Sequence, residues 1–156
     1  MLKQLDRLSV EVDGRYATAN ELKFLKDYLD SIPERVAIYE KVSKAEAEII
    51  DTWEDEKRHY PEDLFHMGDY DMSDICRRDA NDLLRCATVA MLFDEMDRLK
   101  EGMLIWYETI VKAFSYKWYA GIDYRLMQDV IKLFLDEKEA AVMIPIFQLE
   151  QSVLSV

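Results

Sequence analysis

Residues that interrupt regular secondary structure are scarce in this chain. Its 156 residues include four glycines and three prolines, and half of the residues are hydrophobic. Glycine and proline mark turns and loops, so their scarcity favours helices over loops or disorder. A chain of this length is expected to form one domain that buries a core of its own.

Basic residues are also in short supply. The chain has 20 Lys and Arg against 32 Asp and Glu, which gives a formal net charge of −12. This argues against binding to nucleic acid or to anionic membrane surfaces, because both rely on basic side chains. No apolar run approaches the roughly 20 residues of a membrane span, and the first residues lack a signal-peptide core. We therefore expect a soluble, cytoplasmic protein with no membrane insertion and no nucleic acid partner.

Cysteine and histidine occur twice each. Cys76 and Cys86 would lie about 15 Å apart along one helix, too far for a disulfide, and the apolar neighbours of Cys86 predict a buried small hydrophobe. His59 and His66 fall in an irregular acidic stretch, which disfavours a haem-binding sensor. A di-iron site is also disfavoured, because only residues 56–59 show a Glu-x-x-His spacing that such sites use twice. No metal is expected.

The spacing of apolar residues predicts helices almost throughout and no strands. A first helix over 2–12 ends at the Asp13-Gly14 turn, and Thr18 with Glu21 fits a capping box. A boundary is expected near 43–46 and an irregular loop over 54–74. Ser73 or Asp74 is the expected cap of the following helix. Further helices are predicted over 22–53, 75–93, 103–114, 123–135 and after the cap-like 136–139.

Three reactive side chains stand together at the start of the helix over 75–93. Cys76 and Asp79 share a face because they are three residues apart, and Arg78 lies beside them. A thiol can form a thioether, a carboxylate can accept from a row of N–H donors, and a guanidinium can pair with carboxylates. A linear tetrapyrrole (bilin) presents the matching groups: a vinyl-type carbon, inward-pointing pyrrole N–H groups and two propionates.

Plainer interpretations of these residues stay open. Cys76 could be a small buried hydrophobe, Arg78 could form an exposed helical ion pair with Asp82, and Asp79 could be a solvated acid in the first turn of a helix. Trp118 and Tyr119 could be ordinary core aromatics.

The wider sequence resembles the phycobiliproteins, the bilin-carrying subunits of cyanobacteria and red algae, and phycocyanin and allophycocyanin α subunits in particular. The attachment signature Cys-x-Arg-Asp followed by Leu-Arg appears as Cys76-Arg77-Arg78-Asp79 with Leu84-Arg85. Other matches, in the family's order and spacing, are 13–16 with 20–22, 43–45, 118–119 and 152–155. The similarity spans nearly the full length.

This resemblance implies an all-α fold: a globin-like helical domain within residues 1–156, preceded by an N-terminal helical pair (1–31) that mediates dimer formation. It implies a pigment carrier rather than an enzyme, with a phycocyanobilin-like bilin covalently attached to Cys76. Asp79 would accept hydrogen bonds from the pyrrole nitrogens, Arg78 would bind a propionate, and Trp118 and Tyr119 would pack near the rings.

The same resemblance implies partners and a location. We expect pairing with itself or a sister subunit, trimeric or hexameric rings, and the cytoplasmic face of the thylakoid, where phycobilisomes harvest light. The alternative is a pigment-free interaction or assembly protein of the phycobilisome. Departures from the family include Ile75 before the attachment cysteine, where a basic residue is frequent, and Phe93-Asp94-Glu95-Met96 in place of a glycine-containing turn. They indicate a divergent member.

Overall fold

The computed structural model describes residues 1–155, and Val156, the last residue of the predicted domain, lies outside them. The helices are α1 (Leu2–Glu11), α2 (Lys23–Arg58), α3 (Ser73–Phe93), α4 (Met96–Leu99), the π-helical turn η1 (Lys100–Leu104), α5 (Ile105–Ala113), α6 (Lys117–Phe134) and α7 (Glu137–Leu154). The prediction of an all-α, globin-like fold is confirmed. No helix within residues 1–155 is long and apolar enough to cross a membrane.

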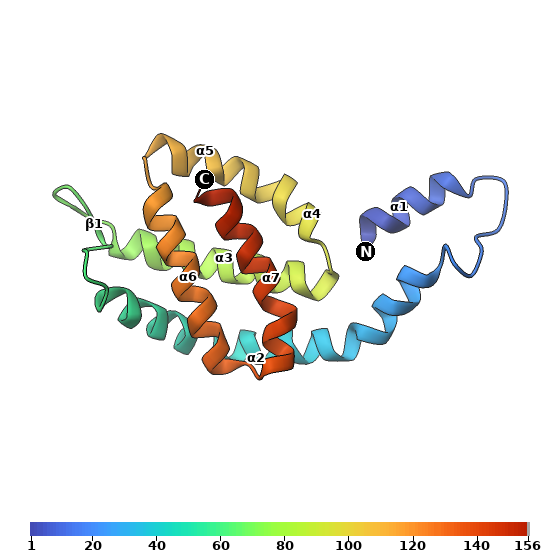
Figure 1. The fold of residues 1–156 in the computed structure, drawn as a ribbon, viewed down its shortest axis with the longest axis horizontal. Helices are drawn as coiled ribbons and strands as arrows, with labels where there is room; N and C mark the ends of the chain where they lie inside the picture. The colour runs from blue at the N-terminus through green and yellow to red at the C-terminus, as the bar shows by residue number, and fades with distance from the viewer. Residues whose placement is uncertain (156) are drawn as a thin grey trace.

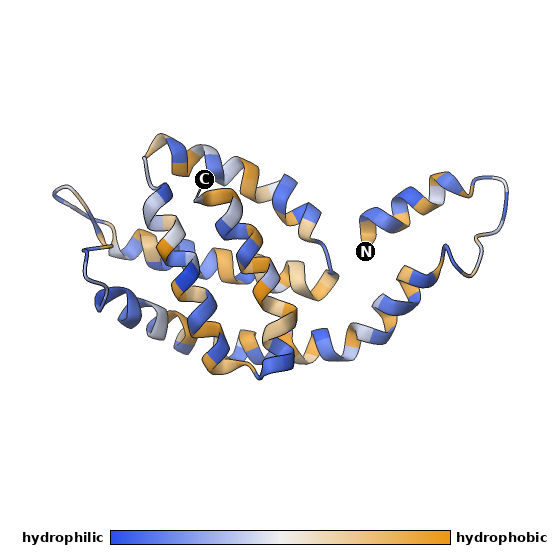
Figure 2. Cartoon of the chain, in the orientation of Figure 1, coloured by the Kyte–Doolittle hydropathy of each residue, from blue (hydrophilic) through white to orange (hydrophobic). Residues whose placement is uncertain are grey.

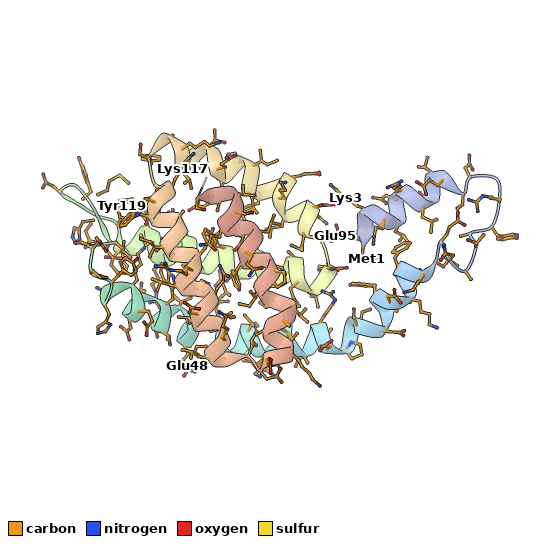
Figure 3. The ribbon with its side chains drawn as sticks, viewed as in Figure 1. Met1, Lys3, Glu48, Glu95, Lys117 and Tyr119 are labelled. Carbon is orange, nitrogen blue, oxygen red and sulfur yellow. The ribbon has the colours of Figure 1, made fainter. Side chains whose placement is uncertain are left out.

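The helices form a body and an arm (Figure 1). In the body, α6 packs on α7 and α2, while α3 packs on α2 and α7. Residues 1–31, which we call the N-terminal arm, comprise α1 and the first part of α2 and project away from the body. The arm folds back so that Met1 and Lys3 lie beside Glu95 (Figure 3), and the amino group of Met1 is 2.9 Å from Glu95 Oε1.

The core lies in the body, where hydrophobic and hydrophilic residues alternate along the helices (Figure 2). On α2 an apolar stripe runs through Ile38, Val42, Ile49 and Trp53, all of them at most 2% exposed. Their spacing of four, seven and four residues keeps them on one side of a helix. The stripe therefore fixes the side of α2 that faces α3 and α6.

Helix α2 corrects two predictions. It runs through Pro33 and through residues 43–46 without interruption, and it ends at Arg58 rather than before Glu54. The predicted internal boundary and the start of the predicted loop were therefore wrong. The physical reason is burial: the stripe of Ile49 and Trp53 continues four residues further to Lys57, which is also buried.

The segment between α2 and α3 contains a small hairpin that was not predicted. Strands β1 (His66–Met67) and β2 (Tyr70–Asp71) pair antiparallel, and Gly68 between them adopts φ +61°. A two-residue Gly-Asp loop is a recognised hairpin signal, because glycine tolerates positive φ. The expectation of no strands was wrong at this one place.

Helix starts follow local hydrogen bonding. Thr18 and Glu21 form both capping-box bonds, with the Thr18 amide 2.8 Å from Glu21 Oε2 and the Glu21 amide 3.3 Å from Thr18 Oγ1, although α2 begins at Lys23. Asp136 and Glu139 form the complete capping box that opens α7. At α3 the predicted caps Ser73 and Asp74 were wrong, because the N-cap is Met72, which makes no side-chain capping bond; instead, Asp71 Oδ1 accepts from the Ser73 amide at 2.8 Å.

The two turns that flank α4–α5 use left-handed backbone without glycine. Asp94, in the turn predicted to replace a glycine-containing one, adopts φ +52°, and Ser115 before α6 adopts φ +55°. Aspartate tolerates this region because its short polar side chain hydrogen-bonds locally. Helix α6 begins directly after the second turn, six residues before the predicted Asp123, so Trp118 and Tyr119 lie in its first turn.

Candidate functional site

A cavity of about 350 Å³ lies between α3, α5, α6 and α7 and is bordered by the 59–72 segment. Its volume is within the roughly 300–1,000 Å³ typical of ligand and cofactor sites. The wall is mainly apolar. It is formed by Trp53, Met67, Met72, Ile75, Cys76, Arg78, Asp79, Ala80, Leu83, Leu84, Tyr107, Ile110, Val111, Phe114, Tyr116, Ala120, Asp123, Tyr124, Met127, Phe147 and Glu150.

The structure brings Cys76, Arg78 and Asp79 together on this wall. Helix α3 begins at Ser73, so all three belong to its first two turns. Cys76 is half-buried and its thiol is free. The Asp79 side chain is 29% exposed and the Arg78 side chain 67% exposed, which places the carboxylate at the rim of the cavity rather than out in water.

Asp79 is held from two sides. Arg78 donates to Oδ1 from Nε at 3.0 Å and from Nη2 at 2.8 Å, and the Tyr107 hydroxyl of α5 donates to Oδ2 at 3.1 Å. Burial, reinforced by the Asp79 charge, raises the pKa of Tyr107 above its ordinary value. Tyr107 therefore remains a neutral donor to a carboxylate that faces the cavity.

Cys76 belongs to a second polar chain that crosses the cavity wall to α6 and α2. Its Sγ is 3.5 Å from the Tyr116 hydroxyl, which lies 3.4 Å from Asp123 Oδ2. Asp123 forms an ion pair with Lys57, whose Nζ is 2.9 Å from Oδ1 and 3.1 Å from Oδ2. The thiol is therefore linked through two side chains to a buried cation.

Lys57 is the least solvated charge of this chain of contacts. Its side chain is 0% exposed, and its ammonium group lies 4.8 Å from the ring centres of both Trp53 and Phe65. Such cation–π contacts partly replace lost hydration. Burial raises the pKa of Asp123, and the ammonium group of Lys57 opposes that shift. A lysine and an aspartate that neutralise each other can be tolerated in this apolar setting.

The two aromatic residues expected near the pigment, Trp118 and Tyr119, are not among the residues of the described chain that line the cavity. Trp118 is 53% exposed, and Figure 3 shows Tyr119 at the start of α6, on the side of the body where the hairpin projects. Tyr119 stacks on Tyr116 with ring centres 4.9 Å apart, and Trp118 meets Tyr119 edge-on at 5.0 Å. Tyr119 therefore contacts the cavity wall at Tyr116.

Several residues in or beside the cavity were not predicted, although the sequence signals two of them: Glu150, which lines the cavity, and Lys57, which pairs with the cavity residue Asp123. Lys57 follows Trp53 by four residues, and Glu150 follows Phe147 by three, so each charged residue continues an apolar stripe. A charge on a buried stripe needs a partner or a function. By contrast, nothing in the local pattern distinguishes Tyr107, Tyr116 and Tyr124 from core tyrosines.

The donor set fits a bilin. A thiol and a carboxylate line the same apolar space, a guanidinium stands at its rim, and tyrosine hydroxyls border it. These are the groups required by a reactive vinyl-type carbon, pyrrole N–H groups and propionates. Among the ionisable groups of the wall, Arg78 and Asp79 lie at its exposed end.

The fold defines an all-α, globin-like protein. A phycobilisome protein family profile matches residues 8–152, and the chain belongs to this family. The comparison with curated proteins gave no match. The predicted resemblance is therefore confirmed, and membership implies a light-harvesting phycobiliprotein rather than an enzyme. Proteins of this family generally carry covalently bound bilins, assemble as oligomers with sister subunits, and belong to complexes on the cytoplasmic side of thylakoids.

Proposed function

We propose that this chain is a light-harvesting and energy-transfer subunit that carries one phycocyanobilin-like bilin on Cys76. The observation that supports this most directly is the placement of Cys76 and Asp79 on the wall of one apolar cavity, with Arg78 at its rim. If these residues lay apart on an exposed helix surface, an ordinary buried thiol, a surface ion pair and a solvated acid would explain them equally well.

Each residue has a definite task in this proposal. The Cys76 thiol adds across the vinyl-type double bond of the first ring, forming a C–S bond while its proton passes to the neighbouring carbon. Asp79 accepts hydrogen bonds from the central pyrrole N–H groups, and charge-assisted bonds of this kind are about twice as strong as neutral ones. Arg78 is exposed enough to turn from Asp79 to a propionate.

The aromatic residues would limit the motion of the pigment. Tyr107, Tyr116 and Tyr124 line the cavity, and the stack of Tyr119 on Tyr116, with Trp118 behind it, stiffens one wall. A clamped bilin keeps its excitation long enough to pass it on, whereas a mobile one loses it as heat. In this proposal Trp118 and Tyr119 support the pigment indirectly, through Tyr116.

The N-terminal arm is proposed as the pairing surface, with residues 1–31 docking on itself or on a sister subunit and leading to trimeric or hexameric rings. The arm exposes apolar side chains that the body does not cover, including Leu2, Leu5, Val10, Leu22 and Leu29. Burying such a patch in an interface is favourable. The proposed location is the cytoplasm, at the thylakoid surface.

The test is co-expression with enzymes that make phycocyanobilin. The wild-type chain should give a coloured band that fluoresces with zinc after denaturing electrophoresis. Cys76→Ala should abolish the band, while the matched Cys86→Ala variant should keep it. Colour that persists in Cys76→Ala would discredit the attachment site. A colourless wild-type protein that still forms dimers would instead favour the pigment-free assembly subunit.

A further inference from the structure

The inner end of the cavity carries two polar groups that the proposed attachment chemistry does not use. Glu150 on α7 is 0% exposed, and Tyr124 on α6 is 5% exposed. Both line the cavity. The two carboxyl oxygens of Glu150 and the hydroxyl oxygen of Tyr124 have no hydrogen-bond partner among residues 1–155. Buried polar groups without partners are rare in folded proteins and call for an explanation.

Glu150 lies near Tyr124 and near Cys86, which follows Cys76 by ten residues on α3. Burial and then the Glu150 carboxyl raise the pKa of Tyr124, and the same two causes raise the pKa of the Cys86 thiol. Glu150 therefore faces both α6 and the part of α3 near Cys86. Cavity residues on α3 run from Ile75 to Leu84, and exposure falls from 41% to 1% between them.

Distance and burial together define an inner and an outer end. Cys76 and Leu84 are separated by about 12 Å of helical rise. A pigment tethered at Cys76 would extend from the exposed rim toward the buried end, since four rings in a row span several turns of α3. Its last ring would then meet Glu150 and Tyr124.

The carboxyl of Glu150 has a protonation state suited to one kind of partner. Complete burial without a partner disfavours the charged carboxylate of Glu150 and raises its pKa, which favours the neutral acid, with one O–H donor and one carbonyl acceptor side by side. A lactam offers the complementary pair, an N–H donor and a C=O acceptor along the same edge of a ring.

We propose that Glu150 and Tyr124 form a binding subsite for a lactam ring, specifically the terminal ring of a linear tetrapyrrole at the end opposite the thioether. Glu150 accepts from the ring N–H and donates to its carbonyl, while the Tyr124 hydroxyl supplies a further hydrogen bond to that carbonyl. This inference rests on the proposed function, because it assigns the far end of the same ligand.

The experiment uses the full chain in a Cys76→Ala background, so that binding is reversible, with biliverdin, a bilin that has a lactam at each end, as the probe. Quenching of tryptophan fluorescence reports binding, because Trp53 lines the cavity. Glu150→Met removes both hydrogen bonds at similar volume, whereas Glu150→Gln keeps an amide donor and acceptor. We expect Glu150→Met to weaken biliverdin binding at least about tenfold, equivalent to the loss of one hydrogen bond between neutral groups. The affinity of Glu150→Gln should stay close to that of the parent protein.

The melting temperature of the ligand-free protein separates a role of Glu150 in binding from a role in stability. Removing an unpartnered buried acid should raise the melting temperature of ligand-free Glu150→Met, so stability and affinity change in opposite directions. Equal affinities in the Glu150→Met and parent proteins, or no biliverdin binding by the parent, would overturn the subsite. Covalent colour at Cys76 with Glu150-independent affinity would remove this inference alone. Glu150-dependent binding without covalent colour would remove the attachment proposal alone.

Discussion

Lys57 and Asp123 join the end of α2 to the first half of α6 through an ion pair of 2.9 Å, and no part of the Lys57 side chain reaches solvent. Asp123 in turn lies 3.4 Å from the Tyr116 hydroxyl beside Cys76. The pair thus connects the packing of two core helices to the position of the thiol. Mutation can test how much this ion pair contributes to the stability of the protein.

Lys57→Met should destabilise the protein strongly. The substitution leaves the Asp123 carboxylate buried without its cation, which typically costs about 3–5 kcal/mol. Urea unfolding followed by circular dichroism measures the change. The double variant Lys57→Met with Asp123→Leu should recover much of the loss, because no uncompensated charge remains. A loss below about 1 kcal/mol in the single variant would show that the pair is solvated.

The contribution of Glu150 to the stability of the pigment-free protein should fall as pH rises above about 4.3, the ordinary pKa of an unfolded glutamate. Burial raises the pKa of Glu150 in the folded state, so the folded protein holds a proton that the unfolded chain releases. Stability contributed by that proton is complete at low pH and declines with rising pH, by at most about 1.4 kcal/mol per unit.

Glu150→Gln should lack this decline. Urea midpoints of the variant and the wild type, measured between about pH 5 and 8, should therefore diverge as pH rises, with the variant gaining relative stability. Parallel profiles would mean that Glu150 ionises in the folded protein at its ordinary pKa.

Asp79→Asn should leave the bilin attached but poorly held. The amide keeps the shape of the side chain and loses the negative charge that the pyrrole N–H groups require, so the native absorption band should shift and fluorescence should drop severalfold. Spectra in acidic urea, where the protein environment is removed, should match the wild type and serve as the control. An unchanged native spectrum would separate Asp79 from the pigment.

Leu29→Asp should weaken pairing through the N-terminal arm. Leu29 is 54% exposed on the arm, and Leu133 is 72% exposed on the body, so Leu133→Asp is the matched control. A charge buried in an apolar interface is costly, whereas the same change on an uninvolved surface is nearly neutral. Sedimentation of the purified proteins should show dissociation for Leu29→Asp only. A similar effect of both variants would remove the arm as the pairing surface.

Local sequence was a good guide where local interactions decide the structure. The capping boxes at Thr18 and at Asp136 are formed by residues three apart, and both are present. The turn at Gly14, with φ +79°, is likewise local. The boundary errors at Arg58 and Lys117 arose where packing against other helices extends a helix beyond what its own sequence indicates.

The sequence alone determined the helical class, the family and the grouping of Cys76, Arg78 and Asp79, because helical periodicity and short-range spacing are written in consecutive residues. Only the tertiary structure decided that Tyr107, Tyr116, Asp123 and Glu150 share a cavity with them, and that Lys57 pairs with Asp123. These residues come from α2, α5, α6 and α7, and their proximity depends on how the helices pack. A contact between distant segments leaves no trace in the spacing of either one.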